Sequence, residues 1–114
     1  MRESEILRSI VVRLRPLLPR LVRVQSGTFR ARGSHVHAAS AGTPDLLGFC
    51  RHGRIVALEV KRPGEVATDE QISFLASVVT CGGIGAVVTS AEGAEEIIRY
   101  ECLDHDEERA KREN

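Results

Sequence analysis

The segment Arg54–Lys61, RIVALEVK, constrains the fold most, because an apolar strand pattern here carries two charged residues near its end. Side chains alternate between the two faces of a strand, so Glu59 and Lys61 share one face and Val60 takes the other. Burying charge costs free energy unless the charge is paired, so this placement requires a reason. A surface salt bridge at a fraying strand end is one explanation, and a functional site is the other.

A second strand precedes this one. Residues Asp45–Cys50 form a short apolar run, and His52-Gly53 is a turn signal between two strands. Antiparallel pairing around the turn places Asp45 near residues 58–60, at the same end of the hairpin as Glu59. Two carboxylates that close repel each other unless a cation lies between them, and hard oxygen ligands select Mg²⁺ or Mn²⁺. Taken alone, Asp45 is explained as an aspartate at a strand start or turn.

The first helix offers a third carboxylate. Residues Glu3–Leu14 are predicted to form an amphipathic helix, whose apolar stripe consists of Ile6, Leu7, Ile10, Val11 and Leu14. At about 100° per residue, Glu3 falls in the middle of that stripe and Glu5 on the opposite side. Glu3 therefore faces the protein body and is a candidate metal ligand, directly or through water. The alternative is an N-terminal acid favoured by the helix dipole.

The remaining pattern predicts an α/β fold with the order α-β-β-β-α-β-α. The other expected elements are a strand at Leu21–Gln25, a loop at Ser26–Gly42 that allows one distorted strand turn, a helix from Thr68 to about Thr80, a strand at Ala86–Thr89, and a helix from Ser90 or Ala91 to about Tyr100. Three strands followed by a helical crossover to a fourth imply a mixed, approximately four-stranded sheet flanked by helices.

The helix after residue 68 begins with a capping box. Thr68 is followed three residues later by Gln71, so each side chain can bind the other's backbone N–H. The expected inner face of this helix consists of Ile72, Leu75, Ala76 and Val79.

Charge is divided unevenly along the chain. Residues 1–62 carry twelve Lys/Arg against four acids, a net +8, and residues 63–114 carry four against twelve, a net −8. A basic half is what a polyanion-binding face needs, although the two halves can also pair their charges. No apolar run approaches the roughly 20 residues that span a bilayer. Glu3 and Glu5 break any signal-peptide layout, so we expect a cytoplasmic protein without membrane contact.

Cysteine usage points away from a disulfide framework. Cys50, Cys81 and Cys102 are odd in number and contain no CxxC pair. We expect reduced thiols. The alternative is zinc ligation together with His35 or His37.

Several of these residues resemble a known signature. Gly42-Thr43-Pro44-Asp45, then Glu59-Val60-Lys61, then Gln71 on the next helix resemble the PD-(D/E)XK nuclease motif. One branch, the VRR-NUC (virus-type replication-repair nuclease) domain, is further resembled by the helix that carries Glu3, by Ser26-Gly27, and by Cys81-Gly82-Gly83 leading into Ala86-Val87-Val88. The resemblance covers roughly residues 3–98. It implies a restriction-endonuclease-like core, which we expect as a single domain over residues 1–103. The tail at 104–114 lies outside the resemblance, and because it is nearly all charged we expect it to be solvated and flexible.

The resemblance also implies a site. It assigns Glu3, Asp45, Glu59 and the backbone carbonyl of Val60 as ligands of Mg²⁺ or Mn²⁺. It assigns Asp45, Glu59, Lys61 and Gln71 to catalysis. Lys61 would orient or help deprotonate the attacking water, or stabilise the developing charge. Gln71 would lie near the metal, whereas the capping box offers it a purely structural role.

The implied function is a metal-dependent endonuclease that hydrolyses DNA phosphodiester bonds, selective for branched DNA such as Holliday junctions. Candidate DNA contacts are Ser26, Arg30, Arg32, His35 and His37. Stand-alone members of this branch resemble homodimeric junction resolvases. The first-helix stripe with Leu17 and Leu18 is a candidate dimer interface, and a phage or bacterial source fits the branch.

Three alternatives remain open from the sequence. The first is a non-catalytic nucleic-acid-binding module with the same fold. The second is a partner-binding α/β domain whose charges simply pair, and the third is a restriction- or nicking-type nuclease. Base-specific recognition is not expected, because no helix-turn-helix or zinc-finger pattern occurs and only three Phe and one Tyr are available for stacking.

Overall fold

The computed structural model describes residues 1–24, 28–31, 34–37 and 42–104, with the backbone alone for the two short middle ranges. Its elements, in chain order, are α1 (Glu3–Leu14), β1 (Val22–Arg23), β2 (Thr28–Ala31), β3 (Ser34–His37), β4 (Leu46–Phe49), a 3-10 turn (Arg51–Gly53), β5 (Ile55–Val60), α2 (Asp69–Thr80), β6 (Ile84–Val88), α3 (Ala91–Ile98) and a π-helical segment (Arg99–Asp104). The expected tail at 104–114 lies outside the described residues, apart from residue 104.

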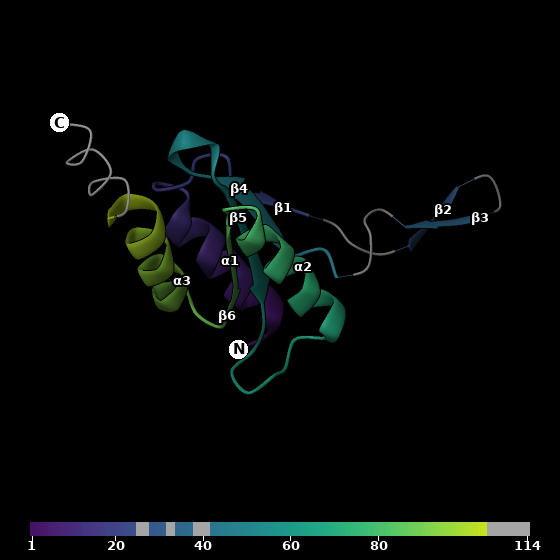
Figure 1. Cartoon of the computed structure of the whole chain (residues 1–114). Coiled ribbons are helices and arrows are strands. Elements are labelled where there is room, and N and C mark those ends of the chain that lie inside the picture. Colours follow the sequence, from purple (N-terminus) through teal and green to yellow (C-terminus); the bar gives the residue numbers. More distant parts are fainter. Residues whose placement is uncertain (25–27, 32–33, 38–41, 105–114) are drawn as a thin grey trace.

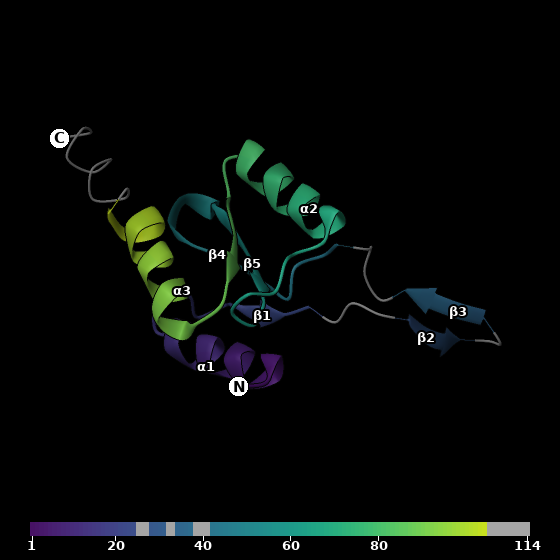
Figure 2. The ribbon, with the colours of Figure 1, turned by 90° about the horizontal axis from the view of Figure 1, so that it is seen from below.

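The main sheet has four strands in the order β1-β4-β5-β6. β4 pairs antiparallel with β1 and β5, whereas β6 pairs parallel with β5, so the predicted mixed sheet is confirmed. In Figures 1 and 2, α1 and α3 lie together on one face of this sheet and α2 covers the other. The chain thus forms the expected α/β layers.

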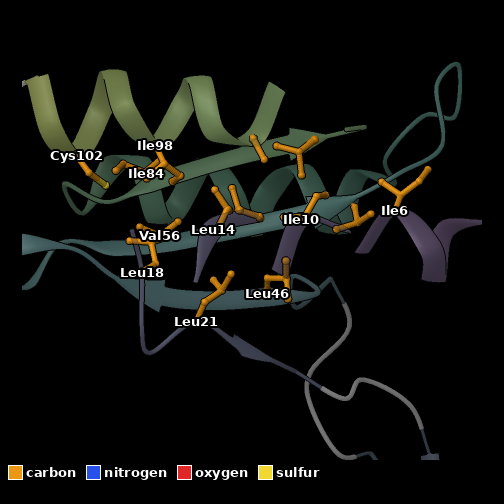
Figure 3. Packing of buried hydrophobic residues seen from close by; sticks show 14 residues of the cluster. Ile6, Ile10, Leu14, Leu18, Leu21, Leu46, Val56, Ile84, Ile98 and Cys102 are labelled. Carbon is orange, nitrogen blue, oxygen red and sulfur yellow. The ribbon is translucent and has the colours of Figure 1, made fainter. Parts of the chain in front are cut away.

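The hydrophobic core lies between the sheet and the helices α1 and α3. The apolar stripe of α1 points into it, and Ile10 and Leu14 have no exposed surface. From β5, the alternating residues Val56 and Leu58 enter the same core, as the strand pattern predicted. Figure 3 shows Leu14 of α1 and Val56 of β5 in this core, together with Ile98 of α3. Burial of each such side chain stabilises the fold by about 1.5–3 kcal/mol.

Helix α2 is rotated from its predicted orientation. Leu75 is buried, but Ile72 and Val79 are 49% and 54% exposed, so the expected inner face is wrong. The helix instead approaches β6 closely, since a Cβ on Gly85 would lie 2.7 Å from the carbonyl oxygen of Leu75. Gln71 lies one turn before Leu75, so the same rotation turns Gln71 toward the sheet. A prediction from the apolar residues alone places Gln71 on the exposed face.

The segment predicted as a loop contains a hairpin. β2 and β3 pair antiparallel, with Arg30 opposite His35 and Thr28 opposite His37. Figures 1 and 2 show this hairpin apart from the main sheet. In β2, the sequence TFRA alternates polar and apolar residues, which is a strand signal. The Gly, Ser and Ala around the hairpin obscured it.

Two strand boundaries also differ from prediction. β1 is limited to Val22–Arg23, and β6 begins at Ile84 instead of Ala86. Gly83 and Gly85 let α2 lie close to the sheet, because a Cβ on either would meet Val78 or Leu75 within 3 Å. Among the described residues, no helix has the length and apolar character needed to cross a membrane.

Candidate metal centre

Asp45 stands directly before β4, at the end of the β4–β5 hairpin. The register pairs Leu46 with Leu58, so Asp45 lies beside the last residues of β5. Its Oδ2 accepts a hydrogen bond from the backbone N–H of Val60 at 2.8 Å. The predicted placement near residues 58–60 is confirmed.

Gly42 allows the chain before Asp45 to reach this position. Its φ is +82°, and a Cβ built there would lie 2.5 Å from the carbonyl oxygen of Glu70 in the first turn of α2. Only glycine fits such a close approach in this backbone conformation. The Asp45 segment therefore packs directly against the N-terminus of α2, a role for Gly42 that its place in the motif did not reveal.

Glu59 is a buried carboxylate, 3% exposed, on the face of β5 that α2 covers. Its Oε1 accepts a hydrogen bond from Nε2 of Gln71 at 3.0 Å and lies 3.9 Å from Nζ of Lys61. Its Oε2 is buried without any hydrogen-bond donor. Lys61 shares the face, as predicted, and its side chain is 13% exposed.

The surroundings raise the pKa of Glu59 to about 8. Burial is the largest cause, followed by the neighbouring carboxyl of Asp45, while Lys61 acts in the opposite direction and Glu3 adds a small increase. Asp45 and Glu59 therefore lie close enough to share a proton. When both are ionised, neither can donate to the other, which leaves Oε2 of Glu59 without a partner.

Glu3 lies at the rim of this cluster. It is near enough to raise the pKa of Glu59, but its own carboxyl interacts with Glu65 in the turn after β5. Glu65 is paired in turn with Arg62, which lowers the pKa of Glu65. Arg62 and Glu65 closely follow Lys61, but no motif in the sequence marked them as neighbours of the site.

Gln71 both caps α2 and contacts the acidic cluster. Thr68 and Gln71 form the predicted capping box, and the same Gln71 side chain donates to Glu59. The structure therefore gathers Asp45, Glu59, Lys61 and Gln71 around one point, with Glu3 nearby.

The carboxyl oxygens at this point fit a hard divalent cation, although they do not form a complete coordination shell. Within the part of the chain that the structure describes, no group of three or more His, Cys, Asp or Glu side chains is arranged to hold a metal ion. A cation would nevertheless supply what the two adjacent carboxyls lack, namely positive charge between them and a partner for the buried Oε2 of Glu59.

Other predicted contacts lie elsewhere. Ser26 and Arg32 are outside the described residues, and Arg30, His35 and His37 are placed by backbone only, in the β2–β3 hairpin. The three cysteines form no disulfide with one another.

The sequence matches the model of one known protein family. The model of the VRR-NUC domain family matches residues 17–92, well over half of the chain and a range that includes Asp45, Glu59, Lys61 and Gln71. Searches of curated proteins and of solved structures found no match. The fold, the paired carboxyls and the family model agree, and the chain belongs to the VRR-NUC domain family of nuclease-type domains.

Proposed function

We propose that the protein is a divalent-metal-dependent endonuclease that hydrolyses DNA phosphodiester bonds. The observation that carries this proposal is the buried Oε2 of Glu59, which has no donor and lies beside a second carboxyl, that of Asp45. A site that only stabilised the fold would gain from apolar side chains here. A site that binds a cation requires the two carboxyls.

Asp45 and Glu59 are the proposed ligands, with the carbonyl of Val60. In a strand, the N–H and C=O of one residue point to the same neighbour. Because the N–H of Val60 points to Asp45, its carbonyl faces the same space. Glu3 would act from the rim, through water. These are oxygen donors, which favour Mg²⁺ or Mn²⁺ over softer metals.

The chain's own groups would perform distinct tasks. A bound Mg²⁺ or Mn²⁺ would supply positive charge to the scissile phosphate and activate water for attack. Lys61 lies on the same face as Glu59, so its Nζ can orient that water, take its proton, or neutralise charge on the phosphate. Gln71 keeps the Glu59 carboxylate in place by donating to Oε1.

Branched DNA, such as a Holliday junction, is the proposed substrate. Arg30 and His35 are direct cross-strand partners, so they lie on the same face of the β2–β3 hairpin, where a phosphate backbone can approach. We propose that this hairpin contacts DNA backbone and that the enzyme acts in the cytoplasm of a bacterial or phage-infected cell.

A homodimer would match the two-fold symmetry of a four-way junction. The stripe of α1 suggested as its interface is unavailable, because Ile6, Ile10 and Leu14 are buried in the chain's own core, as is Leu18. A dimer would therefore use another surface.

The test compares cleavage of linear, flapped and four-way-junction DNA in Mn²⁺, in Mg²⁺ and in EDTA. Wild type should cut only with metal, and fastest on the junction. Lys61→Ala should be slower by about 10²- to 10⁴-fold, the usual contribution of a positioned acid or base. Arg99→Ala is the matched control, because it removes one exposed positive charge from the end of α3, where Arg99 pairs with Glu95.

Equal rates for wild type and Lys61→Ala on every substrate would refute the catalytic assignment. Cleavage in EDTA would refute the metal requirement. DNA binding without cleavage under all conditions would identify a non-catalytic binding module instead.

A further inference from the structure

We propose that the N-terminal capping box of α2 is a positioning device for the metal site, in which Thr68 acts through Gln71 to hold Glu59. This inference rests on the proposed metal function. It assigns a role at the site to Thr68, an exposed residue whose hydrogen bonds go to Gln71 and not to Asp45 or Glu59.

Three hydrogen bonds connect the helix end to the carboxylate. Oγ1 of Thr68 accepts from the backbone N–H of Gln71 at 3.2 Å, and the backbone N–H of Thr68 donates to Oε1 of Gln71 at 2.8 Å. At its other end, the Gln71 amide donates from Nε2 to Oε1 of Glu59 at 3.0 Å. The Gln71 side chain is therefore held from both ends.

The capping box also decides which way the amide faces. A backbone N–H can only donate, so it must meet the carbonyl oxygen of the Gln71 side chain. The NH₂ group is then left for Glu59, and an inverted amide would lose both bonds. The backbone N–H of Thr68 thus ensures that a donor, and not an acceptor, faces the carboxylate of Glu59, while its Oγ1 holds the backbone of Gln71 in place.

The Gln71 amide makes the two carboxylate oxygens of Glu59 unequal. Gln71 and Lys61 both lie against Oε1, whereas Oε2 is buried without a donor. A glutamate carboxylate on its own can rotate about several bonds, and each alternative would offer the cation a different oxygen. The fixed amide removes that freedom, as partners of metal ligands commonly do. Oε2 is then the oxygen kept for the ion.

An ordinary helix cap would affect stability and nothing else, and the chain provides a control for that case. Ser90 caps α3 in the same manner, with Oγ accepting from the backbone N–H of Gly93 at 3.0 Å. Within the described part of the chain, no hydrogen bond joins Ser90 to Asp45 or Glu59. Loss of either cap should lower the melting temperature, but only the cap of α2 should change metal binding.

The experiment measures the Mn²⁺ dissociation constant of the full chain by titration, together with the melting temperature. Gln71→Met should weaken Mn²⁺ binding by about 10- to 100-fold, the usual effect of losing a partner of a metal ligand. Thr68→Ala should weaken Mn²⁺ binding by at least about threefold. This loss is smaller than that of Gln71→Met, because the backbone N–H of residue 68 still holds the Gln71 amide. Thr68→Ser should restore wild-type affinity, and Ser90→Ala should leave it unchanged.

A double variant tests whether Thr68 acts through Gln71. If it does, adding Thr68→Ala to Gln71→Met causes no further loss of Mn²⁺ affinity, because the two residues form one pathway. Full additivity of the two losses would overturn the proposal. An equal loss of affinity in Thr68→Ala and Ser90→Ala would also overturn it, since it would reflect general destabilisation.

Asp45→Asn separates this inference from the function on which it rests. If wild type binds Mn²⁺ and Asp45→Asn does not, while the Thr68 and Gln71 variants bind as wild type does, the positioning role is wrong and the metal site stands. If wild type and Asp45→Asn bind Mn²⁺ alike, the metal site itself is wrong and the positioning role is overturned with it.

Discussion

At the scale of single residues, the buried carboxyl of Glu59 is the feature that most affects folding stability. Among the described residues it is the only buried charged side chain, and it lies beside a second carboxyl. Such a pair costs folding free energy when both groups are ionised, unless a cation is bound. Without metal, the repulsion between the two carboxylates should therefore lower the stability of the fold, and a bound cation should remove this repulsion.

The first prediction concerns the pH dependence of stability without metal. The pKa of Glu59 is raised from 4.5 to about 8, so the folded state favours the protonated form. The resulting stabilisation is complete below pH 4.5 and is lost as pH rises through 8. Between these values, the unfolding free energy in EDTA should fall with pH through this group. Chemical denaturation across this range measures the slope.

Glu59→Gln is the control for that slope, since it removes the titrating group and keeps a side chain of similar shape. The variant should lose the decline that Glu59 causes. An identical pH dependence in wild type and Glu59→Gln would show that Glu59 does not titrate in this range.

The second prediction is that Asp45→Asn stabilises the metal-free protein. Asparagine keeps an oxygen for the N–H of Val60 but removes the charge that faces Glu59. At pH 9 the unfolding free energy should rise by about 1 kcal/mol, roughly the value of one pKa unit. Saturating Mn²⁺ should raise the stability of wild type and leave the variant unchanged. A variant that is less stable than wild type without metal would contradict the proposed repulsion.

At the scale of elements, the sequence predicted what local periodicity determines. The alternation along β5 placed Glu59 and Lys61 on one face, and the turn at His52-Gly53 placed Asp45 beside them. Periodicity could not predict how α2 docks, because the close approach of Leu75 to Gly85 sets its rotation. For that reason periodicity did not bring Gln71 to the site; the resemblance to the nuclease motif implied its place there, and the structure adds the hydrogen bond to Glu59.

The hairpin of β2 and β3 was missed for a different reason. Its strands are four residues each and pair only with one another in the described chain. A strand that short has too few alternating positions to stand out from Gly- and Ser-rich surroundings.

The third prediction concerns Gly42. Gly42→Ala forces a positive φ on an L residue and places its Cβ 2.5 Å from the carbonyl oxygen of Glu70, so α2 and the Asp45 segment must separate. Stability should fall by about 1–3 kcal/mol, and Mn²⁺ affinity should fall with it. Thermal unfolding and Mn²⁺ titration measure the two effects.

Gly64→Ala is the matched control, because Gly64 has a φ of +88° and no neighbouring atom within 4 Å of its Cβ position. This variant should show the backbone cost alone and keep wild-type Mn²⁺ affinity. Equal effects of the two substitutions on Mn²⁺ binding would mean that the close approach at Gly42 does not position Asp45.

At the scale of the whole molecule, basic and acidic residues divide between the two halves of the chain, yet the acidic half contributes α2 and α3 to the same fold as the basic strands. In Figures 1 and 2 the β2–β3 hairpin and α3 lie at opposite ends of the molecule. Because the hairpin forms its own two-stranded sheet, the DNA contacts proposed for it can be tested independently of the metal ligands proposed on the main sheet.

The fourth prediction is that Arg30→Ala weakens DNA binding without affecting the metal site. Loss of one phosphate contact should reduce the slope of log affinity against log salt by about 1, while Mn²⁺ affinity stays at the wild-type value. Binding titrations at several salt concentrations measure the slope. An unchanged slope would exclude Arg30 as a phosphate contact.

The central claim is that Asp45 and Glu59 share one divalent ion beside Lys61. A crystal structure of the wild-type protein grown with Mn²⁺, with anomalous data that locate manganese, tests it most directly. The account predicts an anomalous peak between Asp45 and Oε2 of Glu59, with Gln71 still bound to Oε1. No peak at that position, or peaks confined to histidine or cysteine side chains elsewhere, would contradict it.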